Sequence, residues 1–475
     1  MKVPNFKEYL TEEKHDKPRL VIITDEPEKA KTFHTADRLQ EEAKKLGWDY
    51  YLYKLTGGYT SYEKGIRRVH NKEDDKGFIV NSDTIAVFRG SVVRKDSWMD
   101  LVSPFEKHQV CCINSRDCIE ICTDKFRTAL KLAEFGLKQP KQSLVHDKDD
   151  VMKSFEKLET DFPIILKTLR GSKGVGVLFI ESKIGLDSIV QLVNKQDEDA
   201  DLLVQEYIKT DYDVRALVLG GKILSVMKRP VIKGDFRSNV SQGSKPETLK
   251  LTELEISETL KAAKAVDGLW TAVDFIPSKN RETEPPFMID VNSSPGTEGM
   301  EEATGRNISK EILEHFENRK NWVQAPSQCG FKEVVTIKPF GDIVAKFDTG
   351  NSGTNVIHAE KMEVKGNKIN WSLYDKKVVS NIIKKETISV GGLRDYEEDR
   401  YMITFSFFIN ALSSNMITLD VSFAGKLYKD VEFTLDDRED RTHILLDRAF
   451  MKKLNVVVNP ARKYIITTPY TIDKD

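Results

Sequence analysis

The fold of this chain is decided by two short apolar runs that carry acidic residues, WTAVDFI at residues 270–276 and FMIDVN at residues 287–292. Because side chains alternate between the two faces of a strand, Asp290 and Asn292 are expected on one face. With Asp274 on a neighbouring strand, these side chains supply hard oxygen donors suited to Mg²⁺, which usually shares its coordination shell with substrate phosphates. The pattern predicts a metal site and nucleotide chemistry.

Small residues follow the second run, in the sequence NSSPG at residues 292–296. Such a loop allows the backbone to approach a ligand closely. The alternative interpretation of the same stretch is an Asx turn after an edge strand. The choice between a ligand loop and a turn depends on what the rest of the chain contains.

Composition indicates a folded protein of several domains. The 475 residues are enough for roughly two to four domains, and 39% hydrophobic with 31% charged residues is typical of globular chains. No run approaches the roughly 18 apolar residues of a spanning helix, and the start MKVPNFK lacks the apolar stretch of a signal peptide. A cytoplasmic location without membrane association is therefore expected.

Charge and cysteine content narrow the class further. The net charge of −2 shows no overall excess of lysine and arginine of the kind that nucleic-acid-binding proteins have, so nucleic acid is not expected as a partner. The five cysteines form neither a disulfide framework nor a paired CxxC zinc pattern, and reduced thiols are expected at Cys111, Cys112, Cys118, Cys122 and Cys329.

Strand and helix patterns alternate in the first part of the chain. The helical spacing covers residues 32–46, and the strand-like runs cover residues 20–24, 50–53, 84–88 and 109–113. This order predicts an open parallel sheet. Such sheets bind ligands beyond the carboxyl ends of their strands, where Arg89 and Asn114 fall.

Two lysines and a glycine-rich stretch suggest where a nucleotide would bind. Lys125 opens a predicted helix, and Lys167 follows the apolar residues 162–166, so its charge projects from a buried strand and needs an anionic partner. The stretch GSKGVGV at residues 171–177 is a loop between strands whose backbone amides could cradle phosphates, although it lacks the P-loop order. A solvated lysine and a simple hairpin turn are the structural alternatives.

A predicted strand, LLVQEYI at residues 202–208, runs into a linker-like segment. Backbone groups of such a linker can form hydrogen bonds with an adenine base, and a nearby carboxylate can accept hydrogen bonds from ribose hydroxyls. In DFRSN at residues 235–239, Arg237 offers a planar fork for phosphate oxygens and Asn239 a further polar ligand. Each residue alone could form an ordinary surface ion pair, so the shared order of these stretches with the acidic runs carries the argument.

From about residue 84 to residue 316 the chain resembles the ATP-grasp superfamily, and specifically its RimK-like branch of glutamate ligases. The matching stretches, in chain order, are TDK at 123–125, IILK at 164–167, GSKGVGV at 171–177, VQEYI at 204–208, DVR at 213–215, DFRSN at 235–239, VD at 273–274 and DVNSSPG at 290–296. This ordered set is highly specific to the family.

The resemblance implies a role for each matched residue. The metal ligands would be Asp274, Asp290 and Asn292, holding Mg²⁺ with Mn²⁺ as an alternative, and Arg237 would also act in catalysis. The residues implied to bind ATP are Lys125, Lys167, Gly174, Gly176, Glu206, Tyr207, Asp213, Arg237, Ser238 and Asn239. Of these, Glu206 and Tyr207 would flank the adenine and Asp213 would meet the ribose. Two departures stand out, because the family usually has glutamate at position 290 and a tighter turn than residues 277–286.

The chemistry implied by the resemblance is activation of a carboxylate by ATP. The carboxylate would attack the γ-phosphate to give an acyl phosphate and ADP, and an amine would then displace phosphate to leave an amide. The lysines, the arginine and the metal would neutralise charge on the transferring phosphoryl group. The implied substrates are an amino acid such as glutamate and a peptide or protein acceptor.

A composition shift marks a separate C-terminal domain after a polar linker at residues 319–328. Strands are expected at residues 333–337, 343–347, 378–383, 401–409, 416–423, 428–435, 455–458 and 464–468. The stretch AKFDTG at residues 345–350 contains the Asp-Thr-Gly turn of aspartic proteases, and ILLDR follows at residues 444–448.

This all-β segment resembles the retropepsin-like domain that accompanies RimK-type ligases and often carries the label of an ATP-dependent zinc protease. No HExxH or other zinc spacing occurs in it. The resemblance implies Asp348 as a catalytic carboxylate, and one such residue per chain would require a dimer. Two departures from the family are Asn351 after the Asp-Thr-Gly turn, where alanine is usual, and Asp447 at a position that is usually glycine, which places a second charge where the backbone normally packs closely.

The expected organisation is a pre-ATP-grasp α/β domain at residues 1–120, an ATP-grasp α+β domain at 121–320 and a retropepsin-like β-barrel at 333–475. The favoured function is an ATP- and Mg²⁺-dependent ligase that forms an amide bond and associates as a homo-oligomer. The alternative is an aspartic peptidase or peptide-binding protein in which the ATP-grasp half serves as a nucleotide-gated module.

Overall fold

The protein is described by a computed structural model that forms two compact units, an N-terminal unit ending at Ala325 and a C-terminal unit beginning at Pro326. The boundary falls within residues 319–328, where the sequence predicts a linker. The structure describes residues 17–24, 34–55, 57–63, 66–72, 74–89, 96–168, 177–196, 201–231, 245–324, 326–388, 412–423, 426–436, 438 and 442–467.

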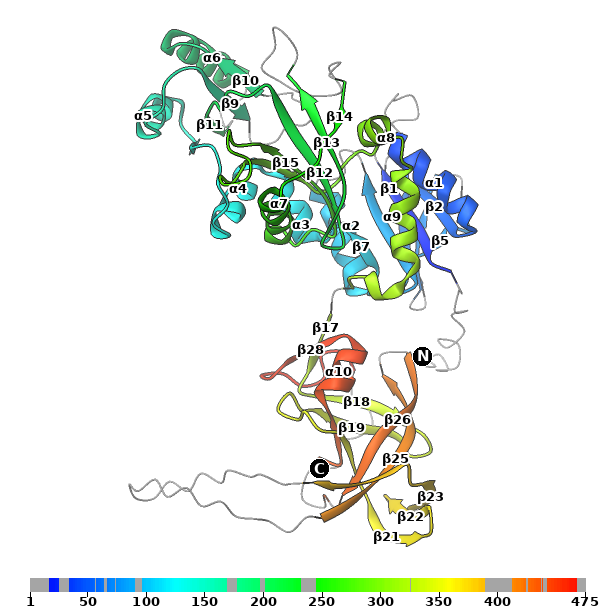
Figure 1. Ribbon diagram of the computed structural model, residues 1–475. Helices are drawn as coiled ribbons and strands as arrows, with labels where there is room; N and C mark the ends of the chain where they lie inside the picture. The colour runs from blue at the N-terminus through cyan, green and yellow to red at the C-terminus, as the bar shows by residue number, and fades with distance from the viewer. Residues whose placement is uncertain are drawn as a thin grey trace, which may run out of the picture. The chain divides into compact units, whose positions relative to one another are not determined.

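The N-terminal unit begins with the parallel sheet that the sequence predicts, in the order β2-β1-β6-β7 (Figure 1). Its strands are β1 (Arg19–Thr24), β2 (Asp49–Lys54), β6 (Thr84–Arg89) and β7 (Cys111–Ile113). Helices α1 (His34–Leu46) and α2 (Asp96–Lys107) connect them, and a small sheet holds β3 (Tyr59–Glu63), β4 (Ile66–His70) and β5 (Phe78–Ile79). The βαβ prediction is confirmed, because β1 pairs in parallel with both β2 and β6.

Two helices lead from this sheet into the next part of the unit. Helix α3 (Arg116–Thr123) starts at Ser115, whose hydroxyl accepts from the Cys118 amide, and α4 (Lys125–Glu134) starts at Asp124, whose carboxylate accepts from two backbone amides. Such side-chain caps satisfy amides that lack a partner within the helix. The predicted helix opening at Lys125 is confirmed.

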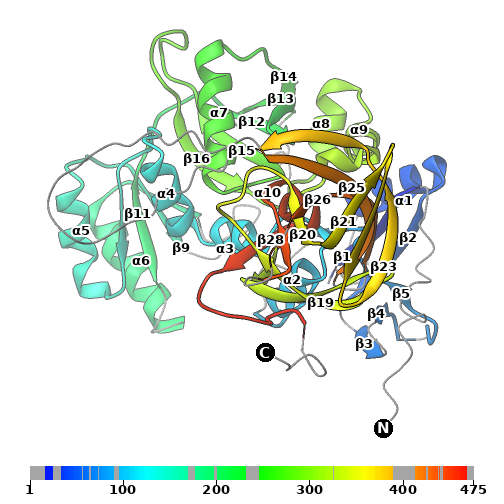
Figure 2. The same cartoon turned by 90° about the horizontal axis from the view of Figure 1, so that it is seen from below.

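A four-stranded antiparallel sheet in the order β10-β9-β11-β8 follows, with its own apolar core. Its strands are β8 (Gln142–Val145), β9 (Ile164–Thr168), β10 (Val177–Ile180) and β11 (Leu202–Glu206). A 3-10 helix η3 (Lys148–Asp150) and helices α5 (Val151–Lys157) and α6 (Lys183–Gln196) belong to the same lobe, which stands apart at one side of Figure 2.

The second antiparallel sheet has five strands in the order β14-β13-β12-β15-β16. These are β12 (Tyr212–Leu219), β13 (Lys222–Pro230), β14 (Glu247–Thr248), β15 (Trp270–Ile276) and β16 (Phe287–Asn292), accompanied by α7 (Glu253–Ala265), α8 (Glu298–Thr304), α9 (Ile308–Glu317) and the 3-10 helix η5 (Arg319–Asn321). The two acidic runs are neighbouring antiparallel strands, as the metal-site prediction requires.

One core joins this second sheet to the first. Leu20 of β1 and Leu39 of α1 pack in the same buried cluster as Leu217 of β12, Trp270 of β15 and Ile312 of α9. The residues expected to form two domains, 1–120 and 121–320, therefore share apolar packing within one unit, and their separation into domains stays a prediction.

The C-terminal unit is a closed barrel. Its main sheet has the order β18-β19-β27-β20-β26-β25-β24, and an additional pairing between β18 and β25 closes six of the strands into a ring. The strands are β18 (Lys332–Ile337), β19 (Gly341–Phe347), β20 (Asn355–His358), β24 (Lys384–Ile388), β25 (Leu412–Phe423), β26 (Lys426–Asp436) and β27 (Ile444–Leu446). Buried side chains such as Phe347, Trp371 and Phe433 fill it.

Smaller elements complete the unit. A separate sheet holds β21 (Glu360–Lys365), β22 (Lys368–Leu373) and β23 (Lys376–Asn381), β17 (Ser327–Gly330) pairs in parallel with β28 (Val456–Asn459), and α10 (Arg448–Leu454) lies between β27 and β28 in the chain.

The strand predictions for this unit are mostly confirmed, with one clear error. The expected strand at 401–409 lies outside the described residues. The expected strand at 464–468 is wrong for the described residues 464–467, which have no strand pairing. The amides of Ile465, Ile466 and Thr467 instead donate to the carboxylate of Glu333.

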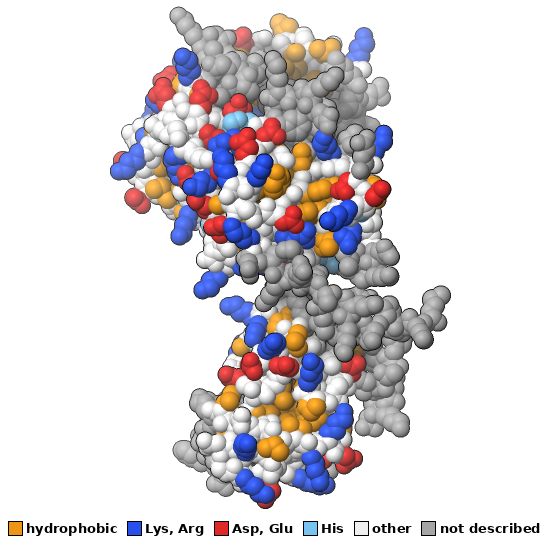
Figure 3. Space-filling view, turned by 90° about the vertical axis from the view of Figure 1, so that its right-hand side faces the viewer, with side chains coloured by type: hydrophobic (Ala, Val, Ile, Leu, Met, Phe, Trp, Pro, Cys, Tyr) orange, Lys and Arg blue, Asp and Glu red, His pale blue; other side chains and the backbone are white. Residues whose placement is uncertain are grey.

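No helix in the described part of the chain is long and apolar enough to cross a membrane. On the face of each unit seen in Figure 3, cationic, anionic and apolar side chains are interspersed. All five cysteines are free, as expected.

Candidate active site

The three predicted metal ligands lie together at one end of the five-stranded sheet. Asp274 of β15 is the direct cross-strand partner of Asp290 of β16, and Ala272 is the partner of Asn292. A bulge follows the Asp274 pair, because Phe275 aligns with Met288 and Ile289 is left without a partner. Directly opposed residues on one face have Cβ atoms about 5 Å apart, so the two carboxylates share one small space.

The charges around Asp290 come from three separate elements. Burial and the neighbouring Asp274 raise the pKa of Asp290, whereas Lys125 and Lys167 act in the opposite direction. Lys167 of β9 is buried, and this burial lowers its pKa to about 8 even though Asp290 opposes the shift. Helix α4, the four-stranded sheet and the five-stranded sheet thus direct titratable side chains to one place.

Two arginines hold Asp274. Arg215 of β12 makes a two-point contact with the Asp274 carboxylate, at 2.8 and 2.6 Å, and Arg229 of β13 lies 3.2 Å from it. Arg229 also makes a two-point contact with Asp213, at 2.6 and 2.8 Å. Burial alone would raise the pKa of Asp274, but Arg215 and Arg229 outweigh it and hold the pKa at about 2. Asp274 is therefore a carboxylate fixed in place by ion pairs.

Sequence reasoning gave no role to Arg215 or Arg229. A signal exists for both, because Asp213 and Arg215 lie two residues apart on one face of β12, and Arg229 faces Asp213 across the β12–β13 pair. Finding it requires the strand register, which depends on contacts far apart in sequence.

The donor set fits a divalent cation. Two carboxylates face each other across neighbouring strands, and the raised pKa of Asp290 reflects in part its repulsion by Asp274. A divalent cation relieves such repulsion, and carboxylate and amide oxygens are the ligands Mg²⁺ accepts. The Asn292 side-chain oxygen accepts from the Ser294 amide at 2.9 Å, which orients the amide group. Ligation of the metal by these three residues stays a prediction.

The predicted adenine and ribose residues lie where β11 ends and β12 begins. The Glu206 carboxylate accepts the Lys141 amide at 3.0 Å, and the Glu206 amide donates to the Lys141 carbonyl at 2.8 Å. The Tyr207 ring meets Phe179 edge-on, with centroids 5.0 Å apart. Asp213 is paired with Arg229. Contact of these residues with a nucleoside stays a prediction.

Five predicted site residues lie outside the described part of the chain. Gly174 and Gly176 fall between β9 and β10, whose antiparallel pairing runs to Lys167 and Val177, and Arg237, Ser238 and Asn239 follow β13. Their roles stay predictions.

Asp348 of the C-terminal unit has a simpler environment. It follows β19, its amide donates to the Leu446 carbonyl at 3.0 Å, and its carboxylate accepts the Gly350 amide at 3.2 Å. Lys346 lies 3.7 Å away. A catalytic role for Asp348 stays a prediction.

Asp447 has a structural role that the sequence did not reveal. Its carboxylate caps α10 by accepting the Phe450 amide at 2.7 Å, and its own amide donates to the Asn355 side chain at 2.9 Å. The charge that departs from the family's glycine is thus placed at a helix N-terminus, where it is stabilised.

Comparison with known proteins gives a consistent result. Residues 122–316 match the model of the RimK-like ATP-grasp domain. The probable alpha-L-glutamate ligase of Chromohalobacter salexigens is 34% identical over 215 residues, which cover 45% of this chain and 69% of that protein. The probable alpha-L-glutamate ligase of Methanococcoides burtonii is 30% identical over 296 residues, covering 61% of this chain and 93% of the relative.

Among solved structures, the fold is similar to that of a Chryseobacterium gregarium RiPP-associated ATP-grasp ligase in complex with ADP and a leader and core peptide. The TM-score is 0.50 at 12% identity, and the match covers 65% of this chain and 99% of the other. At this identity the likeness concerns the fold alone.

The fold and the clustered lysines and carboxylates define an ATP-grasp ligase, an enzyme that forms C–N bonds with ATP and Mg²⁺. The chain belongs to the RimK-like ATP-grasp family. The prediction of that family is confirmed, whereas the retropepsin-like identity of the C-terminal barrel stays a prediction.

Proposed function

We propose that this protein joins an amino acid, glutamate in the first instance, to a peptide or protein through an amide bond, by way of an acyl phosphate. The observation that carries the proposal is the meeting of Lys125, Lys167 and Asp290 beside Asp274. Cations and paired carboxylates close to one another are what phosphoryl transfer from a metal-bound nucleotide requires.

The side chains of this site have separable tasks. Lys125 and Lys167 would neutralise phosphate oxygens, and Lys167 is poised to do so because burial leaves its ammonium without full solvation. Arg215 would keep Asp274 ionised and oriented toward Asp290. Mg²⁺, when bound by Asp274, Asp290 and Asn292, supplies further positive charge near the transferring phosphoryl group.

Glutamate and a peptide acceptor are proposed from the relatives. Two related proteins are named probable alpha-L-glutamate ligases, and a structural neighbour was solved with a leader and core peptide. The chain covers 93% of the length of the Methanococcoides burtonii protein, which supports the same reaction class.

The test is product analysis by mass spectrometry. The purified protein is incubated with Mg²⁺-ATP, each amino acid in turn and short acidic peptides, and the products are compared with those of Asp290→Ala. We expect a peptide product longer by a single glutamate or more, present with wild type and absent with the variant. A product carrying another amino acid would overturn the glutamate assignment, and no product with any mixture would overturn the ligase proposal for peptides.

A second proposal concerns the C-terminal barrel, which we infer to be retropepsin-like and to bind or cleave peptides as a pair of chains. It is supported by Asp348 in an Asp-Thr-Gly turn after β19, next to β27, which pairs with β19 in parallel. Two such carboxylates sharing a proton would require two copies. Asp348→Ala should abolish cleavage of a peptide library while ligation persists, and cleavage that survives the substitution would contradict this proposal.

A further inference from the structure

Asn114 lies at the carboxyl end of β7 and is fully buried. Its side-chain oxygen accepts the amides of Leu269 and Trp270, at 2.7 and 2.9 Å. Its side-chain nitrogen donates to the carbonyls of Trp270 and Ser293, both at 2.7 Å. One amide group at the end of a strand of the N-terminal sheet therefore binds the backbone at the start of β15 and directly after the end of β16.

The position of these contacts matters for the metal site. The pairing of β15 and β16 ends with Ala272 opposite Asn292. Beyond that pair, the backbones at Trp270 and Ser293 bond to the Asn114 side chain, which takes the place of further strand pairing. Ser293 directly follows Asn292, and Trp270 begins the strand that carries Asp274.

The loop after β16 is held from the same side by further contacts. Arg89, at the end of β6, donates to the Pro295 carbonyl at 2.8 Å, and the Ser294 hydroxyl donates to the Phe88 carbonyl at 3.0 Å. These hydrogen bonds fix the loop, and the Arg89 guanidinium also lies over the ring of Trp270 in β15, 5.4 Å from its centroid.

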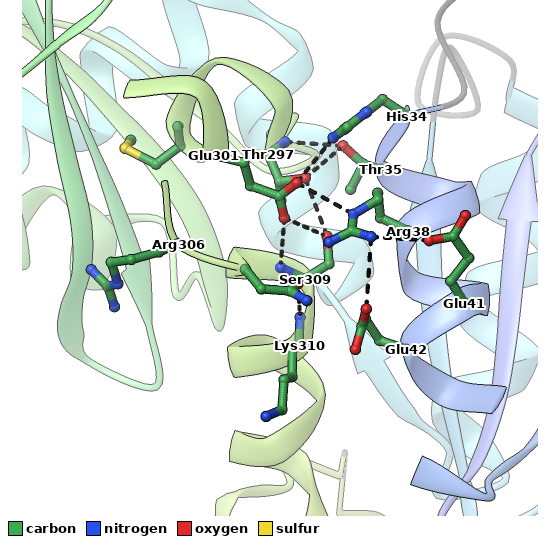
Figure 4. A network of polar contacts seen from close by, with 12 residues as sticks. His34, Thr35, Arg38, Glu41, Glu42, Thr297, Glu301, Arg306, Ser309 and Lys310 are labelled. Atoms are coloured by element: carbon green, nitrogen blue, oxygen red, sulfur yellow. Dashed lines mark hydrogen bonds and ion pairs between the residues drawn. The ribbon is translucent and has the colours of Figure 1, made fainter. Parts of the chain in front are cut away.

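Helix α1 secures the far end of the loop. The Thr297 amide donates to the Thr35 hydroxyl at 3.0 Å. Figure 4 shows Glu301 of α8 directed toward His34 and Arg38 of α1, at 3.0 and 3.5 Å. The loop that follows β16 is thus held by the N-terminal sheet and its helix, and Asn114 hydrogen-bonds both to the start of β15 and to Ser293, the residue that follows β16.

Asn114 also begins the segment that carries Lys125. Ser115, the next residue, caps α3, and α3 leads into α4, which Lys125 opens. Helices α3 and α4 both contact β16, so this segment returns to the strand that carries Asp290 and Asn292. Movement of Asn114 would displace the lysine and the carboxylates relative to each other.

We propose that Asn114 is a positioning residue for metal-dependent nucleotide binding. Its four hydrogen bonds set the spacing of β15 and β16 at the end where Asn292 lies, and so the geometry in which Asp274, Asp290 and Asn292 receive the cation. The inference rests on the assignment of these three residues as metal ligands under the proposed function. It is independent of which amino acid and acceptor the enzyme uses.

The test is the effect of Mg²⁺ on ADP affinity, measured by calorimetry on the full chain with Mg²⁺ and with a chelator. In Asn114→Asp, a second carboxylate oxygen replaces the donor and repels the Trp270 and Ser293 carbonyls. Residues that orient metal ligands typically contribute about 10- to 100-fold to metal affinity. We expect Asn114→Asp to reduce the Mg²⁺-dependent gain in ADP affinity by about that factor, with metal-free ADP affinity unchanged.

Asn114→Ser is the second variant, because its short hydroxyl cannot reach both strands yet leaves room for water. The matched control is Asn355→Asp, which alters a buried asparagine that also joins two backbone segments, but in the C-terminal unit. It should leave ADP affinity unchanged under both conditions.

An unchanged Mg²⁺-dependent gain in a folded Asn114 variant would overturn the proposal, as would equal loss of affinity with and without Mg²⁺ or failure of both variants to fold. A further variant, Asn292→Ala, distinguishes failure of the positioning role of Asn114 from failure of the assignment of Asp274, Asp290 and Asn292 as metal ligands. If it loses the gain while Asn114→Asp keeps it, the positioning role is wrong and the assignment stands. If Asn292→Ala keeps the gain, the assignment is wrong and the positioning role with it.

Discussion

Two aspartates, Asp290 in the N-terminal unit and Asp348 in the C-terminal unit, both belong to short sequence motifs but lie in different surroundings. Asp290 faces the carboxylate of Asp274, and two lysines from other elements, Lys125 and Lys167, act to lower its pKa. Asp348 has a backbone amide and Lys346 beside it. The difference teaches that a short motif alone does not define the electrostatic environment of its aspartate, because long-range packing supplies the neighbouring charges.

The largest expected effect separates the two aspartates. Asp290→Ala should lower kcat/KM for ligation roughly 1,000-fold, because it removes the proposed metal ligand from a preorganised site. Asp348→Ala should leave ligation unchanged. Steady-state kinetics of ADP formation with both variants provide the measurement. Equal ligation activity of Asp290→Ala and Asp348→Ala would contradict the contrast drawn between the two aspartates.

The second largest expected effect is a loss of stability when Arg229, one of the two arginines that hold Asp274 beside Asp290, is removed. Arg229→Ala would remove a buried guanidinium shared by the half-buried Asp213 and the buried Asp274, and breaking a buried ion pair from one side costs about 3–5 kcal/mol. Urea unfolding of the variant should show a loss of that size. The exposed pair of Arg306 and Glu311 supplies a control, since Arg306→Ala should change stability little.

A smaller effect is expected at a carboxylate of the C-terminal unit. Glu333 is fully buried and accepts the amides of Gly330, Ile465, Ile466 and Thr467. Glu333→Gln places an NH₂ group against these donors, and leaving buried groups unsatisfied costs about 1–3 kcal/mol. The unfolding midpoint of the C-terminal unit should fall, while ADP affinity of the N-terminal unit should stay unchanged. An unaltered midpoint would show that these bonds are dispensable.

The smallest effect is the pH dependence of ATP binding. The pKa of Lys167 is about 8, so the side chain is charged below that pH and loses its proton above it. Bound phosphates would raise this pKa, so ATP binding should take up protons near pH 8 and weaken as pH rises further, by up to about tenfold per pH unit. Calorimetry in buffers of different ionisation enthalpy measures the uptake. Lys167→Met should remove it, and uptake that persists in that variant would contradict the assignment.

The sequence predicted the elements that carry the N-terminal site well. Periodicity located β1, α1, β15 and β16, and the order of short stretches identified the ATP-grasp family. These features are local or depend on order along the chain, so they can be read without knowing which segments meet. Lys125 at the start of a helix is an example, because its cap, Asp124, is the adjacent residue.

What the sequence did not predict depends on contacts between distant residues. The pairing of Arg229 with Asp213 follows from strand register, and the bonds of Asn114 link residues more than 150 positions apart. The error at residues 464–467 has the same origin. An apolar stretch predicts a strand, but the amides there bond to a carboxylate far away in the chain, so no ladder forms.

The most direct test of the central claim is ADP release that depends on an added amino acid. Wild type, Asp290→Ala and Asp348→Ala would be incubated with Mg²⁺-ATP and an acidic peptide, with and without glutamate. The account predicts glutamate-dependent ADP release by wild type and Asp348→Ala, and none by Asp290→Ala. Release by Asp290→Ala at the wild-type rate would contradict it.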